Sequence, residues 1–147
     1  MMGGTFSQSD RKFLVDDAQG SIYDLSLAQL AAGRAGSPTL HRYGLQLIGD
    51  HARLNQRLLT LGRAKGVALP VTLSDEDKSK VDAMGRRSGR DLDRALIAEF
   101  IKINAQDVND GRKELSTTRD AAVRSAVSEF VRTEQKHLSE ARRLQRG

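Results

Sequence analysis

Apolar residues recur along most of the chain at steps of three and four positions, which is the spacing of one face of an α-helix. The pattern predicts four long helices, over about residues 10–35, 38–65, 91–115 and 120–144, and a short helix over about residues 75–84. The stripes of the first, second and last long segments are Phe13, Leu14, Ala18, Ile22, Leu25, Ala28 and Ala32; Leu40, Gly44, Leu47, His51, Leu54, Leu58 and Leu61; and Val123, Val127, Phe130, Glu134, His137, Ala141 and Leu144. Such stripes are typical of helices that pack in a bundle.

Capping residues indicate where the predicted helices begin and end. Ser37 followed by Pro38 is a strong start signal, because serine caps free amides and proline suits the first turn. Gly66 suits the left-handed position that ends a helix. Ser74 precedes three acidic residues, which favour the positive end of the short helix. Residues 109–111, Asn-Asp-Gly, are a weak point at which the third long helix could end early.

The four long segments have matched lengths and short links, which favours neighbouring, mostly antiparallel helices. We therefore expect an all-α, ferritin-like four-helix bundle with one short inserted helix, formed as a single domain by residues 10–147. Residues 1–9 are expected to be disordered or extended. No stretch reaches the roughly 20 apolar residues of a membrane span. The start of the chain also lacks the apolar core of a signal peptide.

Composition narrows the classes of partner and cofactor. The chain has no cysteine, which excludes disulfides and thiolate-bound zinc or iron–sulfur centres. Its 24 Lys and Arg against 19 Asp and Glu give a net charge of +5. The charges are interspersed and there is no tryptophan to stack on bases, so no nucleic-acid partner is expected. Homo-oligomerisation stays open.

Polar residues stand in the stripes where apolar residues belong. His51 interrupts the second stripe, and Glu134 and His137 interrupt the last one at a spacing that puts both on one helix face. Asp24 and Asp50 lie beside the stripes. Burying such groups is costly unless they are paired. One interpretation is a transition-metal site of His51, His137 and Glu134, with Asp24 and Asp50 secondary, for iron, zinc, copper or manganese. The other is a metal-free hydrogen-bond network.

With these residues in view, the chain resembles a bacterial ferritin-like domain of unknown function, whose members are often described as predicted outer-membrane or exported proteins. The most specific match is the stretch 47–55, which contains Asp50-His51 followed by Asn55, like the Asp-His-x-x-x-Asn signature of the family. Further matches are residues 10–14, 27–31, 37–38, 65–70, 88–89, 93–95 and 136–138. The resemblance implies a four-helix bundle with an inserted short helix, exported to the bacterial envelope, with polar core residues as candidate metal ligands. It implies no known reaction.

The chain departs from the family pattern at four places: Val131-Arg132 replaces a Leu-Pro pair in the last helix, and the other three concern candidate ligands. Asp24 stands where Glu is common, Asn104 stands where His is common, and Glu134 stands where an apolar residue is more usual. Glu134 could partly compensate for the missing histidine. The candidate ligand set of this chain is therefore not identical to that implied by the resemblance.

The sequence leaves three functions open. The first is a non-catalytic ferritin-like bundle of the envelope or of stress physiology, with a cytoplasmic location as the alternative. The second is a metal-binding or oxidoreductase protein with a degenerate site inside the bundle. The third is a module that binds an acidic partner through Arg86, Arg87, Arg90, Arg142, Arg143 and Arg146. No phosphate-binding glycine loop or nucleophile elbow is present, so hydrolase and nucleotide chemistry are not expected.

Overall fold

The computed structural model describes residues 5–147 and contains five helices in this range. They are α1 (Gln8–Arg34), α2 (Pro38–Lys65), α3 (Asp75–Gly85), α4 (Gly89–Thr117) and α5 (Ala121–Arg146). The predicted all-α fold, with four long helices and one short inserted helix, is confirmed. Of the segment 1–9 that we expected to be disordered or extended, residues 1–4 lie outside the described range, and Gln8 and Ser9 belong to α1.

Side-chain caps explain most of the helix boundaries. Ser7 caps α1 by accepting from the amide of Asp10, whose carboxylate in turn accepts from the amide of Ser7, so the helix begins before Asp10. Ser37 caps α2 and Ser74 caps α3, as predicted. Gly66 ends α2 at φ 70°, a left-handed conformation that is strained for other residues.

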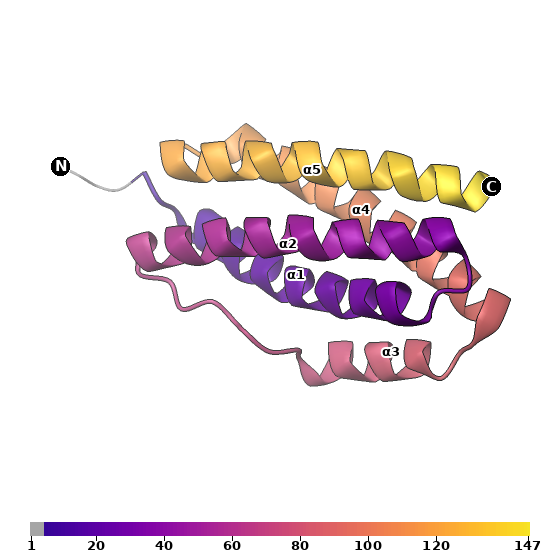
Figure 1. The fold of residues 1–147 in the computed structure, drawn as a ribbon. Helices are drawn as coiled ribbons and strands as arrows, with labels where there is room; N and C mark the ends of the chain where they lie inside the picture. Colours follow the sequence, from indigo (N-terminus) through magenta and orange to yellow (C-terminus); the bar gives the residue numbers. More distant parts are fainter. Residues whose placement is uncertain (1–4) are drawn as a thin grey trace.

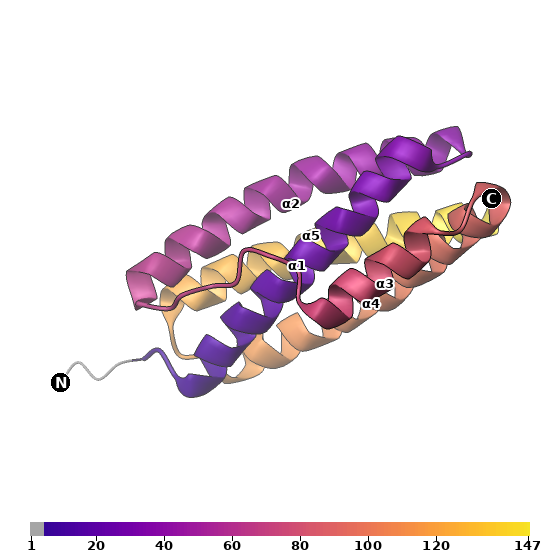
Figure 2. The same ribbon diagram turned by 90° about the horizontal axis from the view of Figure 1, so that it is seen from below.

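The long helices form a bundle in which α1 packs on α2 and α4 packs on α5 (Figure 1). Contacts between α2 and α5 and between α1 and α4 close the bundle. Figure 2 shows that the segment after α2 crosses the outside of the bundle and carries α3 back along α1 and α4. One long crossover of this kind is also the connection found in ferritin-like folds.

A polar layer divides the core into two apolar parts. One part lies towards the end where α1 leads into α2 and includes Leu27, Leu47, Leu96 and Phe100. The other lies towards the opposite end and is formed by Leu14, Ala18, Leu58, Leu61, Val123 and Val127. Between them the four long helices contribute Ser21, Asp24, His51, Asn104, Glu134 and His137, all of them buried.

Two features of the fold differ from what the sequence pattern predicts. In α1 the residues Ile22, Leu25 and Ala32 are only half-buried, whereas Ser21 and Asp24 are buried, so the predicted face was partly wrong. In α4 the Asn-Asp-Gly stretch does not end the helix. Gly111 faces α5 so closely that a Cβ atom there would lie 2.5 Å from Val131 Cγ2, which indicates that this glycine allows a close helix approach.

Candidate metal centre

The three first-choice ligands predicted from the sequence lie together inside the bundle. His51 on α2 and Glu134 and His137 on α5 each place a ligand atom within 4.8 Å of the other two. Their side chains are at most 2% exposed. The interruptions of two apolar stripes therefore meet in one interior site, as the helical spacing indicated.

His51 is held by α1. Its Nδ1 atom lies 3.2 Å from Ser21 Oγ, and its Nε2 atom lies 3.8 Å from Asp24 Oδ2 and 4.0 Å from Glu134 Oε1. Burial lowers the pKa of His51 and outweighs the charge of Glu134, which raises it, so the ring is neutral near pH 7. If Nδ1–H donates to Ser21, the Nε2 lone pair faces the carboxylates, which is the arrangement of a metal-binding imidazole.

His137 lies between two carboxylates. Its Nδ1 atom is 2.9 Å from Glu134 Oε1, and its Nε2 atom is 2.7 Å from Asp50 Oδ2. Burial by itself lowers the pKa of His137, but the bonds and charges of Glu134 and Asp50 outweigh burial and raise it. In this arrangement the ring is an imidazolium that donates to both acids, and a metal ion would have to replace one of its protons.

The backbone of His137 is fixed by α2 and α4. The Tyr43 hydroxyl donates to the His137 carbonyl at 2.9 Å, and the Asn104 amide donates to the Tyr43 hydroxyl at 3.1 Å. Asn104, at the position where the resembled family commonly has His, therefore positions Tyr43.

A second group of converging ligand atoms consists of carboxylates from three helices. One oxygen each of Asp24 on α1, Asp107 on α4 and Glu134 on α5 lie within 4.8 Å of one another. Burial and then the charge of Glu134 raise the pKa of Asp24, and burial and then Asp24 raise that of Asp107. Half-buried Asp17 has its pKa raised to about 8 by burial and by Glu134. For Glu134, hydrogen bonds and nearby charges, chiefly those of His137, outweigh burial and lower the pKa.

The predicted secondary ligands have different places. Asp24 is buried and belongs to the carboxylate group. Asp50 contacts the outer nitrogen of His137 and Arg53 at the surface, and it belongs to neither converging group. Asp107 was not chosen from the sequence, because it lies beside the apolar stripe of α4. Its spacing of three residues from Asn104, which stands in line with Phe100 and Val108, is the signal that could have indicated it.

The fold and this layer define an all-α bundle with a buried site of imidazoles and carboxylates. The chain belongs to the family described as a domain of unknown function, DUF4142, whose match covers residues 2–144. No curated protein gives a significant match to the sequence. Among the described residues, no helix has both the length and the apolar character needed to cross a bilayer.

Solved structures share the fold at low sequence identity. A DUF305 fragment from Deinococcus radiodurans has a TM-score of 0.82 at 14% identity, over 96% of this chain and 98% of that chain. CopM in the Cu(I)-bound form has a TM-score of 0.78 at 16% identity, over 93% of this chain and 95% of that chain. CopM in the Cu(II)-bound form gives 0.79 at 15% identity with the same coverage. At these identities the likeness concerns the fold alone.

Proposed function

We propose that this chain is a metal-binding helical bundle, with a divalent transition-metal ion held by His51, His137 and Glu134. The convergence of their ligand atoms within 4.8 Å in the bundle interior carries the proposal. Three ligands of one ion at about 2.0–2.2 Å need a spacing of this order. The surroundings support it, because Ser21 and Asp50 contact the outer nitrogens of the two rings and orient them.

The donor set favours divalent ions. Two imidazoles and a carboxylate suit Zn²⁺, Cu²⁺, Fe²⁺ and Mn²⁺, whereas Cu⁺ prefers thiolate and thioether sulfur. The chain has no cysteine, and Met84, the one methionine in residues 5–147, lies on α3 outside the bundle. The similar fold of CopM, named in its Cu(I)-bound and Cu(II)-bound forms, makes copper one of the first ions to test. Within this site we expect Cu²⁺ to bind better than Cu⁺.

Metal analysis of tag-free protein tests the proposal. We expect about one equivalent of Zn²⁺ or Cu²⁺ per chain after loading and desalting, and its loss in the His51→Ala, His137→Ala double variant. His41→Ala is the matched control, because His41 lies on the same helix as His51 but is exposed. If zinc, copper and iron all fail to bind in stoichiometric amounts, the polar layer is a hydrogen-bond network and the proposal is wrong.

Thermal unfolding gives an independent measurement. A ligand at 100 times its dissociation constant stabilises the folded state by about 2.7 kcal/mol. For a chain of this size that corresponds to a rise in Tm of roughly 5–10 °C. We expect this rise in the wild-type protein and in His41→Ala, and a much smaller one in the double variant.

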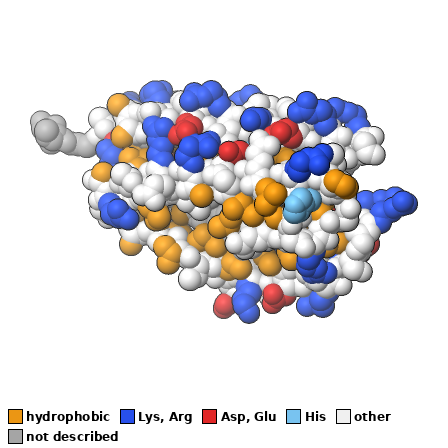
Figure 3. All heavy atoms as spheres, viewed as in Figure 1, with side chains coloured by type: hydrophobic (Ala, Val, Ile, Leu, Met, Phe, Trp, Pro, Cys, Tyr) orange, Lys and Arg blue, Asp and Glu red, His pale blue; other side chains and the backbone are white. Residues whose placement is uncertain are grey.

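A second candidate function rests on the arginine surface. All six arginines predicted to contact an acidic partner are exposed, and Arg90 and Arg143 line one cleft where α4 begins and α5 ends. In the view of Figure 3, Lys and Arg side chains lie along the upper edge and are scattered over the rest of the surface. Acidic-vesicle or DNA binding that weakens steeply with salt would favour this function. Absence of such binding would leave the metal-binding proposal unaffected.

The metal-binding proposal assigns no reaction to the protein. By the family resemblance we further propose a location in the bacterial envelope, with the cytoplasm as the alternative, and cell fractionation with an antibody would decide between them. An association of identical chains remains a prediction that light scattering of the purified protein would test.

A further inference from the structure

The carboxylate group beside the histidines is crowded with hydrogen-bond acceptors. Asp24 and Glu134 are only 4% and 0% exposed, and Asp24 Oδ1 and Glu134 Oε2 are buried without a hydrogen-bond partner among the described residues. Ionised carboxylates only accept hydrogen bonds. Buried acceptors without donors are costly, so this arrangement favours either shared protons or a cation between the three acids.

Glu134 connects this group to the histidine site. It belongs both to the group with His51 and His137 and to the group with Asp24 and Asp107. Its Oε1 atom lies 2.9 Å from His137 Nδ1 and 4.0 Å from His51 Nε2, while Oε2 has no partner. A carboxylate with one oxygen engaged at one site and one left over can serve two neighbouring cations.

We propose that Asp24, Asp107 and Glu134 form a second divalent-cation site, with Glu134 bridging it to the site of His51 and His137. The inference rests on the proposed function through this shared residue. Because its ligands are all oxygens, the second site should prefer a hard cation such as Mn²⁺, whereas the site with two imidazoles should prefer Zn²⁺ or Cu²⁺. The protein would then hold two different ions a few ångströms apart.

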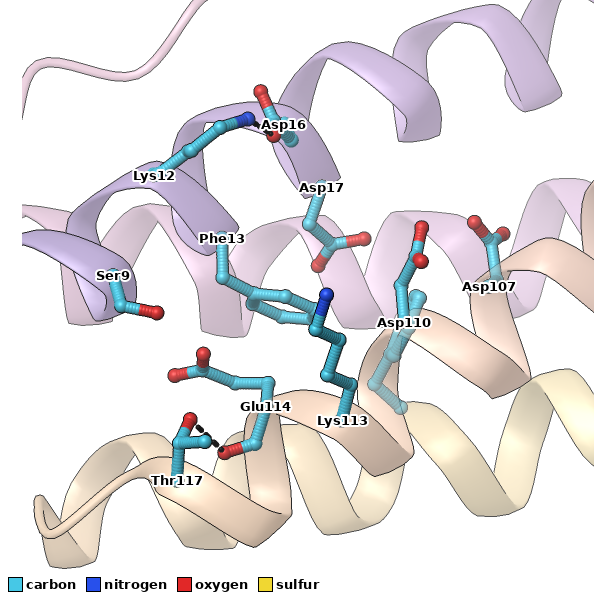
Figure 4. Close-up of a pocket in the computed structure, with 11 residues that line it drawn as sticks. Ser9, Lys12, Phe13, Asp16, Asp17, Asp107, Asp110, Lys113, Glu114 and Thr117 are labelled. Carbon is cyan, nitrogen blue, oxygen red and sulfur yellow. Dashed lines mark hydrogen bonds and ion pairs between the residues drawn. The ribbon is translucent and has the colours of Figure 1, made fainter.

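A cleft between α1 and α4 borders the second site at Asp107. It has a volume of about 380 Å³, and its charged lining includes Asp16, Asp17, Asp107 and Asp110 together with Lys12 and Lys113. Figure 4 shows Asp17 on α1 and Asp107 and Asp110 on the facing α4, with the side chain of Lys113 also on α4. Half-buried Asp107 both lines the cleft and belongs to the carboxylate group, so a hydrated cation can reach the group from this side.

Substitution of Asp107 separates the two sites. Asp107→Asn keeps the shape of the side chain and removes its charge, and Asp110→Asn is the matched control on the exposed part of the same cleft. Protein saturated with Zn²⁺ is titrated with Mn²⁺, and free Mn²⁺ is followed by electron paramagnetic resonance. We expect about one Mn²⁺ per chain in the wild type, at least roughly tenfold weaker Mn²⁺ binding in Asp107→Asn, and a change of less than about twofold in Asp110→Asn.

The outcomes separate this inference from the proposed function. Retained Zn²⁺ binding without Mn²⁺ binding, or Mn²⁺ binding that Asp107→Asn leaves intact, overturns the second site and leaves the histidine site standing. Mn²⁺ binding that persists in the His51→Ala, His137→Ala variant supports the carboxylate site. A wild-type protein that binds Mn²⁺ but neither zinc, copper nor iron overturns the proposed function and leaves the carboxylate site standing. Circular dichroism monitors folding, and Asp24→Asn replaces Asp107→Asn if that variant does not fold.

Discussion

The pair of buried acids Asp10 and Glu114, which contains no candidate metal ligand, gives a sharp prediction. Asp10 on α1 is 0% exposed and Glu114 on α4 is 5% exposed, and Asp10 Oδ1 and Glu114 Oε2 are buried without a hydrogen-bond donor among the described residues. Burial, followed by the hydrogen bond and the charge of Asp10, raises the pKa of Glu114 to about 8. For Asp10 burial acts in the opposite sense, but bonds from Glu114 and Ser7 outweigh it and lower the pKa. The pair therefore holds one proton, which resides on Glu114.

This proton makes the stability of the fold depend on pH. The folded-state pKa of Glu114, about 8, lies above its ordinary value of 4.5, so the folded chain keeps a proton that the unfolded chain releases. Stability from this group is full below about pH 4.5 and is lost as the pH rises to about 8. At pH 7 the loss is at most about 3 kcal/mol. Because Glu114 borders the solvent-filled cleft, we expect about 1–3 kcal/mol.

Glu114→Gln removes the titration and retains a donor for Asp10. We expect the variant to be more stable than the wild type by about 1–3 kcal/mol at pH 7, and by less than about 1 kcal/mol at pH 5. Urea unfolding of metal-free protein, followed by circular dichroism at pH 5, 6, 7 and 8, measures the difference. Glu76→Gln, on the exposed side of α3, is the control and should show no such trend. A difference that is constant over this range, or that favours the wild type at higher pH, refutes the shared proton.

Three further predictions concern the centre and its packing. The pKa of His137 is raised, and a metal ion needs a free lone pair on the ring, so Zn²⁺ affinity should increase about tenfold or more from pH 6 to pH 8. Calorimetry in buffers of different ionisation heat should detect the released proton. An affinity that is constant with pH would contradict this prediction. In Gly44→Ala the new Cβ would lie 2.9 Å from the Ala28 carbonyl oxygen, so urea unfolding should show a loss of at least about 1–3 kcal/mol, and an unchanged midpoint would exclude the close helix approach. Asn104→Ala removes the donor to the Tyr43 hydroxyl and should cost about 1–2 kcal/mol while metal stoichiometry is retained; loss of the metal would instead make Asn104 part of the site.

The fold was predictable where apolar residues mark the buried side. In α2 and α5 the predicted stripes are buried except for Leu54 and Leu144, which are half-buried, and capping serines fix where α2 and α3 begin. In α1 the buried side includes Asp10, Ser21 and Asp24, which periodicity of apolar residues counts as outward-facing. Apolar stripes alone therefore assign to α1 a buried face that is rotated from the observed one.

The candidate centre was predictable only for the residues that stand within apolar stripes. His51, Glu134 and His137 stand within apolar stripes, so their burial and proximity followed from the bundle. Asp107 and Asp17 are half-buried at the edges of α4 and α1. Whether they point into the core depends on the rotation of each helix about its axis. The sequence alone does not specify this rotation to within one residue position on the helix surface.

The two acidic layers of the bundle differ in the cations that the chain itself supplies. Near Asp10 and Glu114, the buried Asp120 is paired with Lys65 Nζ at 2.6 Å, and the remaining two acids need only one shared proton. Within residues 5–147, the ion pair recorded for Asp24 is with His51, and none is recorded for Asp107. The central layer thus combines several carboxylates with imidazoles and without a lysine or arginine on Asp24 or Asp107. Both layers hold buried carboxylate oxygens without a hydrogen-bond partner, but the central layer also brings two imidazoles against its carboxylates, and this combination is the reason to place metal ions there and not at the end of the bundle.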